Sequence, residues 1–257
     1  MKALSIAASG MVAQQHRTDV VANNLANMNT TGYQRSRTEF NNLIVSYMNR
    51  DPNDSSRAGE SVPGGIHLGL GVNVGSVYRV HEQGALKQTG NNFDLAIQGD
   101  GYFQVQLPNG DLAYTRDGTF QLNEAGTLVT HNGFPVQPGV AVPGNVVDIT
   151  INNSGEVIVT QEGGATSTVG ALLLTVFPNR GGLQAVGDNL FMATEASGEA
   201  AVVSPSTNGA GSVLQGFVES SNVNAIEEVS ALIRANRAYE MNSKVMKAAD
   251  EMLATRR

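Results

Sequence analysis

Apolar side chains recur at helical spacing over residues 1–28 of the chain. No proline interrupts residues 2–28, and polar side chains occupy many of the positions between the apolar ones. This pattern predicts one long amphipathic helix, which is expected to end where residues 29–32 favour a turn. Its predicted apolar face comprises Leu4, Ala7, Ala8, Met11, Val21, Ala22, Leu25 and Met28. Taken alone, such a face is typical of an ordinary core helix.

A second helical pattern occupies the C-terminal end of the chain, from about residue 225. Its apolar positions are Ala225, Ile226, Val229, Leu232, Ile233, Tyr239, Met246, Ala249 and Leu253. Four of them, Leu232, Tyr239, Met246 and Leu253, stand seven residues apart, which is the spacing of a coiled-coil seam. We therefore expect the two ends of the chain to pair as a coiled-coil-like helical domain.

The segment that follows the first helix is ambiguous. Its apolar residues Phe40, Leu43, Ile44 and Tyr47 have near-helical spacing, so residues 33–47 could form either a helix or an extended strand. Residues 49–65 are rich in glycine, serine and aspartate and have little to bury, which predicts a loop or an arm.

The periodicity changes from helical to alternating beyond residue 69. Short apolar runs are separated by Asn-Gly and Asp-Gly pairs, which are strong hairpin signals because both residue types tolerate positive φ. The pattern predicts an antiparallel β domain of many short strands. The expected strands are residues 93–97, 102–107, 112–115, 119–122, 127–130, 134–136, 147–151, 156–160 and 170–177, with weaker candidates at 189–194 and 200–203.

These patterns predict an α+β fold, in which long N- and C-terminal helices pair and an antiparallel all-β domain is inserted between them. The expected segments are 1–45 for the first helix and the start of a connector, 46–90 for an arm and linker strands, 91–203 for the β domain, 204–220 for a return connector, and 221–257 for the last helix, pairing with residues 1–30.

Composition narrows the functional classes. The 257 residues include no cysteine, which excludes disulfides and thiolate metal sites. The two ends of the chain are mildly basic and the middle is acidic, without the basic patch and interleaved aromatics of a nucleic-acid-binding protein. The short alanine-rich start is interrupted by Gln14, Gln15 and His16, so we expect no cleaved signal peptide.

The sequence offers little chemistry. The histidines His16, His67, His81 and His131 lie far apart and have no ligand spacing. Most of the candidate carboxylates, Asp94, Asp100, Asp111 and Asp117, adjoin glycine or lie in turn signals, and turn formation explains them better than catalysis. We expect no catalytic residue, no cofactor, no metal site and no small-molecule substrate. An enzyme or carbohydrate-binding β domain with dimerising helices is the disfavoured alternative.

Four stretches of the sequence resemble a known family. They are SGMVAQQ (residues 9–15), DVVANNLANMNTTGYQRSRTEF (19–40), DLAIQGDGYFQVQLPNGDLAYTRDGTFQLNEAGTLVT (94–130) and QGFVESSNVNAIEEVSALIRANRAYEMNSKVMKAADEML (215–253). Together they are similar to the flagellar rod and hook axial proteins of bacteria, and the start MKALSIAASGM is most similar to the subunits of the distal rod. A proximal rod or hook subunit of the same family is the alternative.

The resemblance implies a structural role. The terminal helices would line the inner tube of a helical homopolymer, the β domain would form its outer wall, and the shaft would transmit torque from motor to hook. Implied partners are further copies of the chain, proximal rod proteins, the hook or hook-junction side, surrounding ring proteins and the flagellar export apparatus. The implied location is the basal body, from the periplasm to the outer membrane, after export without a cleaved signal peptide.

Two sets of residues are expected to carry this function. The self-assembly positions are Leu4, Ala8, Met11, Val21, Leu25, Met28, Ile226, Val229, Leu232, Ile233, Tyr239, Met246 and Leu253. The residues that match the family signature and should position the bend after the first helix are Asn23, Asn24, Asn27, Asn29 and Gly32.

Overall fold

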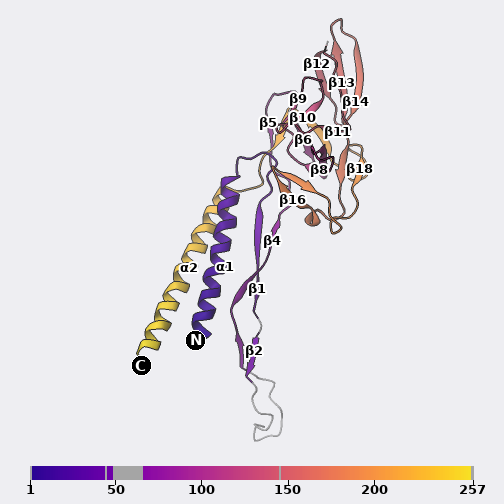
Figure 1. Cartoon of the computed structure of the whole chain (residues 1–257). Helices are drawn as coiled ribbons and strands as arrows, with labels where there is room; N and C mark the ends of the chain where they lie inside the picture. The colour runs from indigo at the N-terminus through magenta and orange to yellow at the C-terminus, as the bar shows by residue number, and fades with distance from the viewer. Residues whose placement is uncertain (1, 44, 49–65, 145, 256–257) are drawn as a thin grey trace, which may run out of the picture. The chain divides into compact units, whose positions relative to one another are not determined.

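The computed structural model describes residues 2–43, 45–48, 66–144 and 146–255. The chain divides into two compact units, which are described separately. The first contains Met1–Leu25, Ser36–Tyr78 and Ala225–Arg257, and the second contains Ala26–Arg35 and Arg79–Asn224. The fold is α+β, as the sequence predicts, with both long helices in the first unit and most of the strands in the second (Figure 1).

The first unit contains helix α1 (Lys2–Ala26) and helix α2 (Ala225–Ala254), which run antiparallel side by side (Figure 1). They approach closely at Gly10, where an added Cβ would lie 2.7 Å from Nδ2 of Asn242. Several of the fully buried helix positions are alanines, namely Ala7, Ala13, Ala235 and Ala249. Small side chains allow neighbouring backbones to approach closely, and here they replace the large anchors of an ordinary core helix.

The rest of the first unit is extended. Strand β1 (Ser36–Asn42) pairs with β4 (Val72–Arg79), and β2 (Val45–Met48) pairs antiparallel with β3 (Ile66–Gly69). Exposed and half-buried residues alternate along β1, which is the period of a strand. The extended alternative for residues 33–47 is therefore confirmed where the chain is described, and the helical alternative is wrong. The predicted arm at residues 49–65 lies outside the described residues.

The second unit is built on a seven-stranded sheet with the order β16-β17-β8-β7-β15-β18, in which β11 also pairs with β7. These strands are β16 (Gln184–Gly187), β17 (Leu190–Met192), β8 (Leu112–Thr115), β7 (Tyr102–Gln106), β15 (Leu174–Val176), β18 (Ala201–Val203) and β11 (Val136–Gln137). Every pairing in this sheet is antiparallel, as the alternating pattern predicts.

Smaller sheets complete the second unit. A three-stranded sheet contains β12 (Val146–Ile151), β13 (Glu156–Gln161) and β14 (Thr166–Ala171). Three further pairs are β9 (Phe120–Leu122) with β10 (Leu128–Thr130), β6 (Leu95–Gln98) with β19 (Ser212–Gln215), and β5 (Leu86–Gln88) with β20 (Phe217–Glu219). A short 3-10 helix, η1, spans Arg180–Gly182.

Asparagine turns connect several of these strands as expected. At the β12–β13 turn, the Asn152 side-chain oxygen accepts hydrogen bonds from the backbone N–H groups of Ser154 and Glu156, and Gly155 has a φ of +82°. The β9–β10 turn repeats this arrangement with Asn123. Asparagine therefore supplies the acceptor that closes the loop, and glycine supplies the left-handed backbone.

The main core lies within the second unit. Its largest fully buried side chains include Leu95, Ile97, Phe103, Phe120, Leu172 and Leu174. A separate aromatic cluster consists of Tyr102, Tyr114, Phe177 and Phe191, whose rings meet mainly edge to face. This burial holds together strands that are far apart in the sequence, and most of the predicted apolar runs contribute to it.

Several strands were not expected. Strands β16, β19 and β20 occur where the sequence predicts a connector or no element, and β5 lies in the segment predicted to contain linker strands but at a position that was not assigned. They have only three or four residues each, too few to display a clear period. The predicted strand 170–177 is interrupted, because Leu172 leaves the ladder to donate its N–H to the carbonyl of Gly155.

Candidate assembly surface

Helix α2 has one side that is covered within the first unit. Glu228, Ala235 and Ala249 are buried on it, and Leu232 and Met246 are half-buried. Successive members are separated by three, four or eleven residues, as expected for one face of a helix. The apolar residues that are fully covered on this face are small, Ala235 and Ala249, whereas the larger Leu232 and Met246 are covered only in part.

Other apolar residues of α2 are exposed. Ile226, Val229 and Ile233 are between 41 and 80% exposed and share one face near the start of the helix. Met241, Val245 and Met252 are between 53 and 68% exposed and share another face near its end. At 3.6 residues per turn these two faces are rotated from one another by about 100°. We call them the early and the late face of α2.

The expected self-assembly positions are distributed over different environments. Met28, Ile226, Val229, Ile233, Tyr239 and Leu253 are exposed, Leu4, Ala8, Met11, Leu25, Leu232 and Met246 are half-buried, and Val21 is buried. Sequence reasoning missed Val12 on α1 and the whole late face of α2. A search for a second apolar face at a different helical phase would have found the late face, since its residues stand four and seven apart.

A groove of about 260 Å³ lies between α1 and the strands of the first unit. Ser9, Val12 and His16 line it from the helix, and Leu43, Val72, Asn73 and Val74 line it from the strands. The Ser9 hydroxyl bridges its two walls, because it donates to the Ile6 carbonyl and accepts the Val72 N–H. Val12 and Leu43 remain exposed at this groove, which makes it a further apolar surface of the unit.

The signature asparagines have different roles. Asn24 is buried and makes two hydrogen bonds of 2.8 Å with Ser36, donating to its carbonyl and accepting its N–H. The Asn24 side chain therefore pairs with both backbone groups of Ser36, as a neighbouring strand would, and ties the first residue of β1 to the end of α1. In the second unit, Asn27 accepts a hydrogen bond from the Thr30 hydroxyl. Asn23 and Asn29 are exposed.

Gly32 is required by both conformation and space. Its φ is +67°, and an added Cβ would lie 2.8 Å from the backbone nitrogen of Asp117. Its N–H donates to the carbonyl of Glu219 at 2.8 Å. Within the second unit, the signature turn is thus packed directly against the segments that contain Asp117 and Glu219, at a position that any side chain would disturb.

Glu219 also belongs to a buried ion pair that sequence reasoning missed. Its carboxylate lies 2.8 Å from Nε of Arg116, and both side chains are no more than 4% exposed. Arg116 donates further hydrogen bonds to the carbonyls of Gly99 and Gly101, and the Gly84 N–H donates to Glu219. The family-like stretches around residues 32, 99–101, 116 and 219 therefore meet at one place. Arg116 lies in an Arg-Asp-Gly turn signal, which concealed its buried role.

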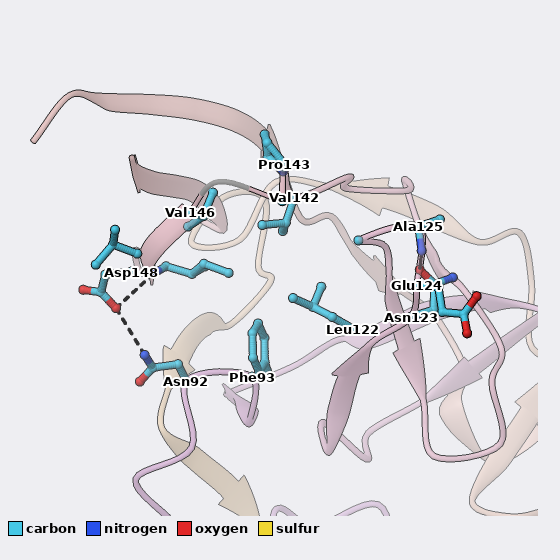
Figure 2. A pocket seen from close by; sticks show the side chains of 14 residues that line it. Asn92, Phe93, Leu122, Asn123, Glu124, Ala125, Val142, Pro143, Val146 and Asp148 are labelled. Carbon is cyan, nitrogen blue, oxygen red and sulfur yellow. Dashed lines mark hydrogen bonds between the residues drawn. The ribbon is translucent and has the colours of Figure 1, made fainter. Parts of the chain in front are cut away.

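The second unit also has a groove of about 510 Å³ beside β12 (Figure 2). Phe93, Leu122 and Val146 contribute apolar side chains to it, and Asn92 donates to Asp148 at its rim. The Asp148 oxygen that Asn92 contacts also accepts the Ile149 N–H, so that carboxylate oxygen is held within the protein. The groove offers apolar contact more than acid–base chemistry.

Within the described residues, no group of three histidine or acidic side chains is placed to hold a metal ion. None of the helices in that part of the chain is long and apolar enough to cross a membrane.

Comparisons with known proteins identify the family. Models described as flagella basal body rod protein, flagellar hook protein FlgE/F/G D1 domain and flagellar basal body rod FlgEFG protein C-terminal match residues 4–34, 96–159 and 214–255. The flagellar basal-body rod protein FlgG of Caulobacter vibrioides is 51% identical over 98% of this chain and 97% of its own length. The FlgG proteins of Agrobacterium fabrum and of Buchnera aphidicola from Baizongia pistaciae are each 46% identical, over 98% of this chain and 97 and 96% of their own lengths. These matches confirm the family that the quoted stretches resemble. The chain belongs to the FlgG family of flagellar basal-body rod proteins, and it is a structural subunit of the rod.

Proposed function

We propose that this chain polymerises through its terminal helices into a helical tube that forms the distal rod and transmits torque from the motor to the hook. In this arrangement α1 and α2 line the inner tube, and the second unit forms the outer wall. Neighbouring partners would be proximal rod proteins, the hook or hook-junction side and the surrounding rings. The subunit would leave the cell through the flagellar export apparatus without a cleaved signal peptide, and the rod would extend from the periplasm to the outer membrane.

The exposed apolar residues of α2 are the observation that carries this proposal. A monomeric protein seldom exposes large contiguous apolar patches, and such patches mark interaction sites. The early face, Ile226, Val229 and Ile233, and the late face, Met241, Val245 and Met252, point in different directions. A single helix packed against one face would leave the other uncovered, so we infer that each α2 contacts more than one neighbouring helix. Contacts between different surfaces of identical subunits generate rings or open helical filaments.

The helix pairing itself forms part of the proposal. Leu232, Tyr239, Met246 and Leu253 stand seven apart along α2; Leu232 and Met246 are half-buried on its covered face, and Tyr239 and Leu253 are exposed. We infer that they form a coiled-coil-like seam with α1 of the same chain and with the helices of neighbouring subunits. The polar residue Asn242, which faces Gly10, would then fix the register of the seam.

Matched valine-to-glutamate substitutions test the role of α2. Val229→Glu and Val245→Glu place a carboxylate on the early and the late face, and Val147→Glu makes the same change at a 69% exposed position of β12. If the faces become buried in the polymer, each helix variant loses about 1 kcal/mol of apolar burial per contact and adds the cost of burying a charge. Electron microscopy of the full-length proteins under polymerising conditions should show tubes for wild type and Val147→Glu only.

The shape of those tubes separates the alternatives within the family. Straight tubes support the distal rod, whereas curved tubes favour a hook subunit. The near-complete coverage of FlgG relatives at 40–51% identity favours the rod. Circular dichroism at low concentration is the control that both variants are folded, so that a loss of tubes reflects assembly. Tubes of normal length from both Val229→Glu and Val245→Glu would contradict assembly through α2.

A further inference from the structure

His81 lies in a short segment of the second unit whose backbone is fixed on both sides of the histidine. The Val80 N–H donates to the Arg35 carbonyl at 2.9 Å. The side chain of Asn222 donates to the carbonyls of Val80 and Glu82, each at 2.9 Å. These hydrogen bonds hold the backbone on both sides of His81 in place.

The ring contacts the aromatic cluster of the second unit. Its Nδ1 lies 3.3 Å from the hydroxyl of Tyr102, and its centroid lies 6.4 Å from that of the Phe191 ring. Tyr102 is only 1% exposed, so its hydroxyl bonds within the protein rather than to bulk water. Nδ1 of His81 accepts the Tyr102 proton in the neutral imidazole that carries its own proton on Nε2, and a protonated Nδ1 cannot accept it.

The charges around the ring are mainly positive. Arg79 stacks over Phe191 at 5.1 Å, and Arg116 lies 5.8 Å from the Tyr102 ring centroid. Arg180, from η1, is the third cation that acts on His81.

The carboxylates nearby are already paired: Asp100 with Arg180, Glu219 with Arg116, and the exposed Glu82 with Arg35. Burial first, and then Arg180, Arg79 and Arg116, lower the pKa of His81 from 6.5 to about 4.

We propose that His81 is an acid-sensitive latch, which holds residues 80–82 on the aromatic cluster when neutral and releases them when protonated. A proton on Nδ1 would take away the acceptor of the Tyr102 hydroxyl and would place a fourth positive charge beside three arginines. The proton comes from the solvent and returns to it, so the release is reversible. This inference does not depend on the proposed polymerisation, because every group involved lies in one unit.

The sign of the effect follows from the two protonation equilibria. The unfolded chain takes up a proton on this histidine near pH 6.5, but the native state does so only near pH 4. Stability is therefore complete above pH 6.5 and falls as the pH decreases through this window. The full difference would change the folding equilibrium about 300-fold, and because His81 is only half-buried we expect on the order of 30-fold.

Histidine variants of the full-length chain test the latch. His81→Gln keeps a polar side chain that does not titrate, and His16→Gln is the matched control at an exposed position of α1 in the other unit. Urea unfolding at pH 7, 6 and 5, followed at low protein concentration, should show a steeper loss of stability with acid in wild type and His16→Gln than in His81→Gln. Asp117 also titrates with a shifted pKa, but it is present in all three proteins, so their difference isolates His81.

Two direct readouts complete the test and apply to wild type even if His81→Gln fails to fold. The first is NMR titration of the four histidine rings, in which the His81 signal should titrate below pH 5. The second is hydrogen exchange at the Val80 amide, corrected for the intrinsic effect of pH, which should lose protection as that signal titrates. A His81 pKa of 6.5 or above, or a Val80 amide equally protected at both ends of the titration, would overturn the proposal.

Discussion

Breaking the buried pair between Arg116 and Glu219 should destabilise the second unit more than any loss of a surface charge. Both side chains are almost fully buried, at 4 and 3% exposure, so neither can be solvated when its partner is removed. Removing one member of a buried pair typically costs about 3 to 5 kcal/mol, because an uncompensated charge remains. The pair also holds three backbone groups, the carbonyls of Gly99 and Gly101 and the N–H of Gly84.

The two single variants should differ in a predictable way. Arg116→Met leaves the Glu219 carboxylate with the Gly84 N–H and leaves two carbonyls without their donor, so we expect a loss of about 4 to 6 kcal/mol. Glu219→Gln preserves an acceptor for Gly84 and leaves Arg116 with its two carbonyls, and we expect about 2 to 4 kcal/mol. The double variant should cost less than the sum by at least about 1.5 kcal/mol, since it buries no unpaired charge.

Urea unfolding of the second unit, followed by the fluorescence of its tyrosines, measures these losses. Arg180→Met is the matched control, because the Arg180–Asp100 pair is 33 and 47% exposed and should contribute at most about 1 kcal/mol. If Arg116→Met unfolds at the same urea concentration as Arg180→Met, or if the two single losses at Arg116 and Glu219 add without coupling, the pair does not hold the three segments together as we argue.

Two further predictions concern Gly32 and Asp117. Gly32→Ala should lower the free energy of unfolding by about 2 to 4 kcal/mol, because the left-handed backbone and a Cβ 2.8 Å from the Asp117 nitrogen both oppose it. Gly90→Ala is the control, since it has φ +78° but no described atom near the added Cβ, and it should lower that free energy by only about 1 kcal/mol in the same urea assay. Burial raises the pKa of Asp117 above 3.8, so its contribution to stability is complete below pH 3.8 and is lost as the pH rises through the native value. Asp117→Asn should remove this contribution. The urea midpoint of wild type, relative to that of the variant, should therefore be higher at pH 3.5 than at pH 7. A relative midpoint that is higher at pH 7 would refute this direction of the effect.

The sequence predicts elements well where one strong signal acts locally. Both helices and most strands of the second unit follow from apolar periodicity and from turns such as those at Asn123 and Asn152. Each of these turns is closed by contacts within five residues, so nothing distant is needed to specify it. The family resemblance likewise follows from contiguous stretches of sequence. The expected assembly positions and segment boundaries stay predictions.

The parts that could not be predicted depend on long-range partners. In the sequence, Asn24 is one of several asparagines near a helix end. Only the position of Ser36 shows that its side chain pairs with the backbone of β1. Strands β5 and β20 each have three residues and exist because they pair with one another across more than 120 residues of sequence. Arg116 and Glu219 are 103 positions apart and carry no local sign of burial.

The two faces of α2 show how a helix in an assembling protein differs from a core helix. A core helix needs one apolar face, and its remaining surface is polar. In α2 the apolar residues that are buried are the small Ala235 and Ala249, whereas large residues such as Ile226 and Met241 are exposed. Folding of the single chain would favour the opposite assignment, because large side chains contribute more when buried. This inversion is explained if other subunits complete the burial that stabilises α2. The exposed early and late faces are therefore better candidates for the assembly contacts than the seven-residue seam, which is the most apparent pattern in the sequence.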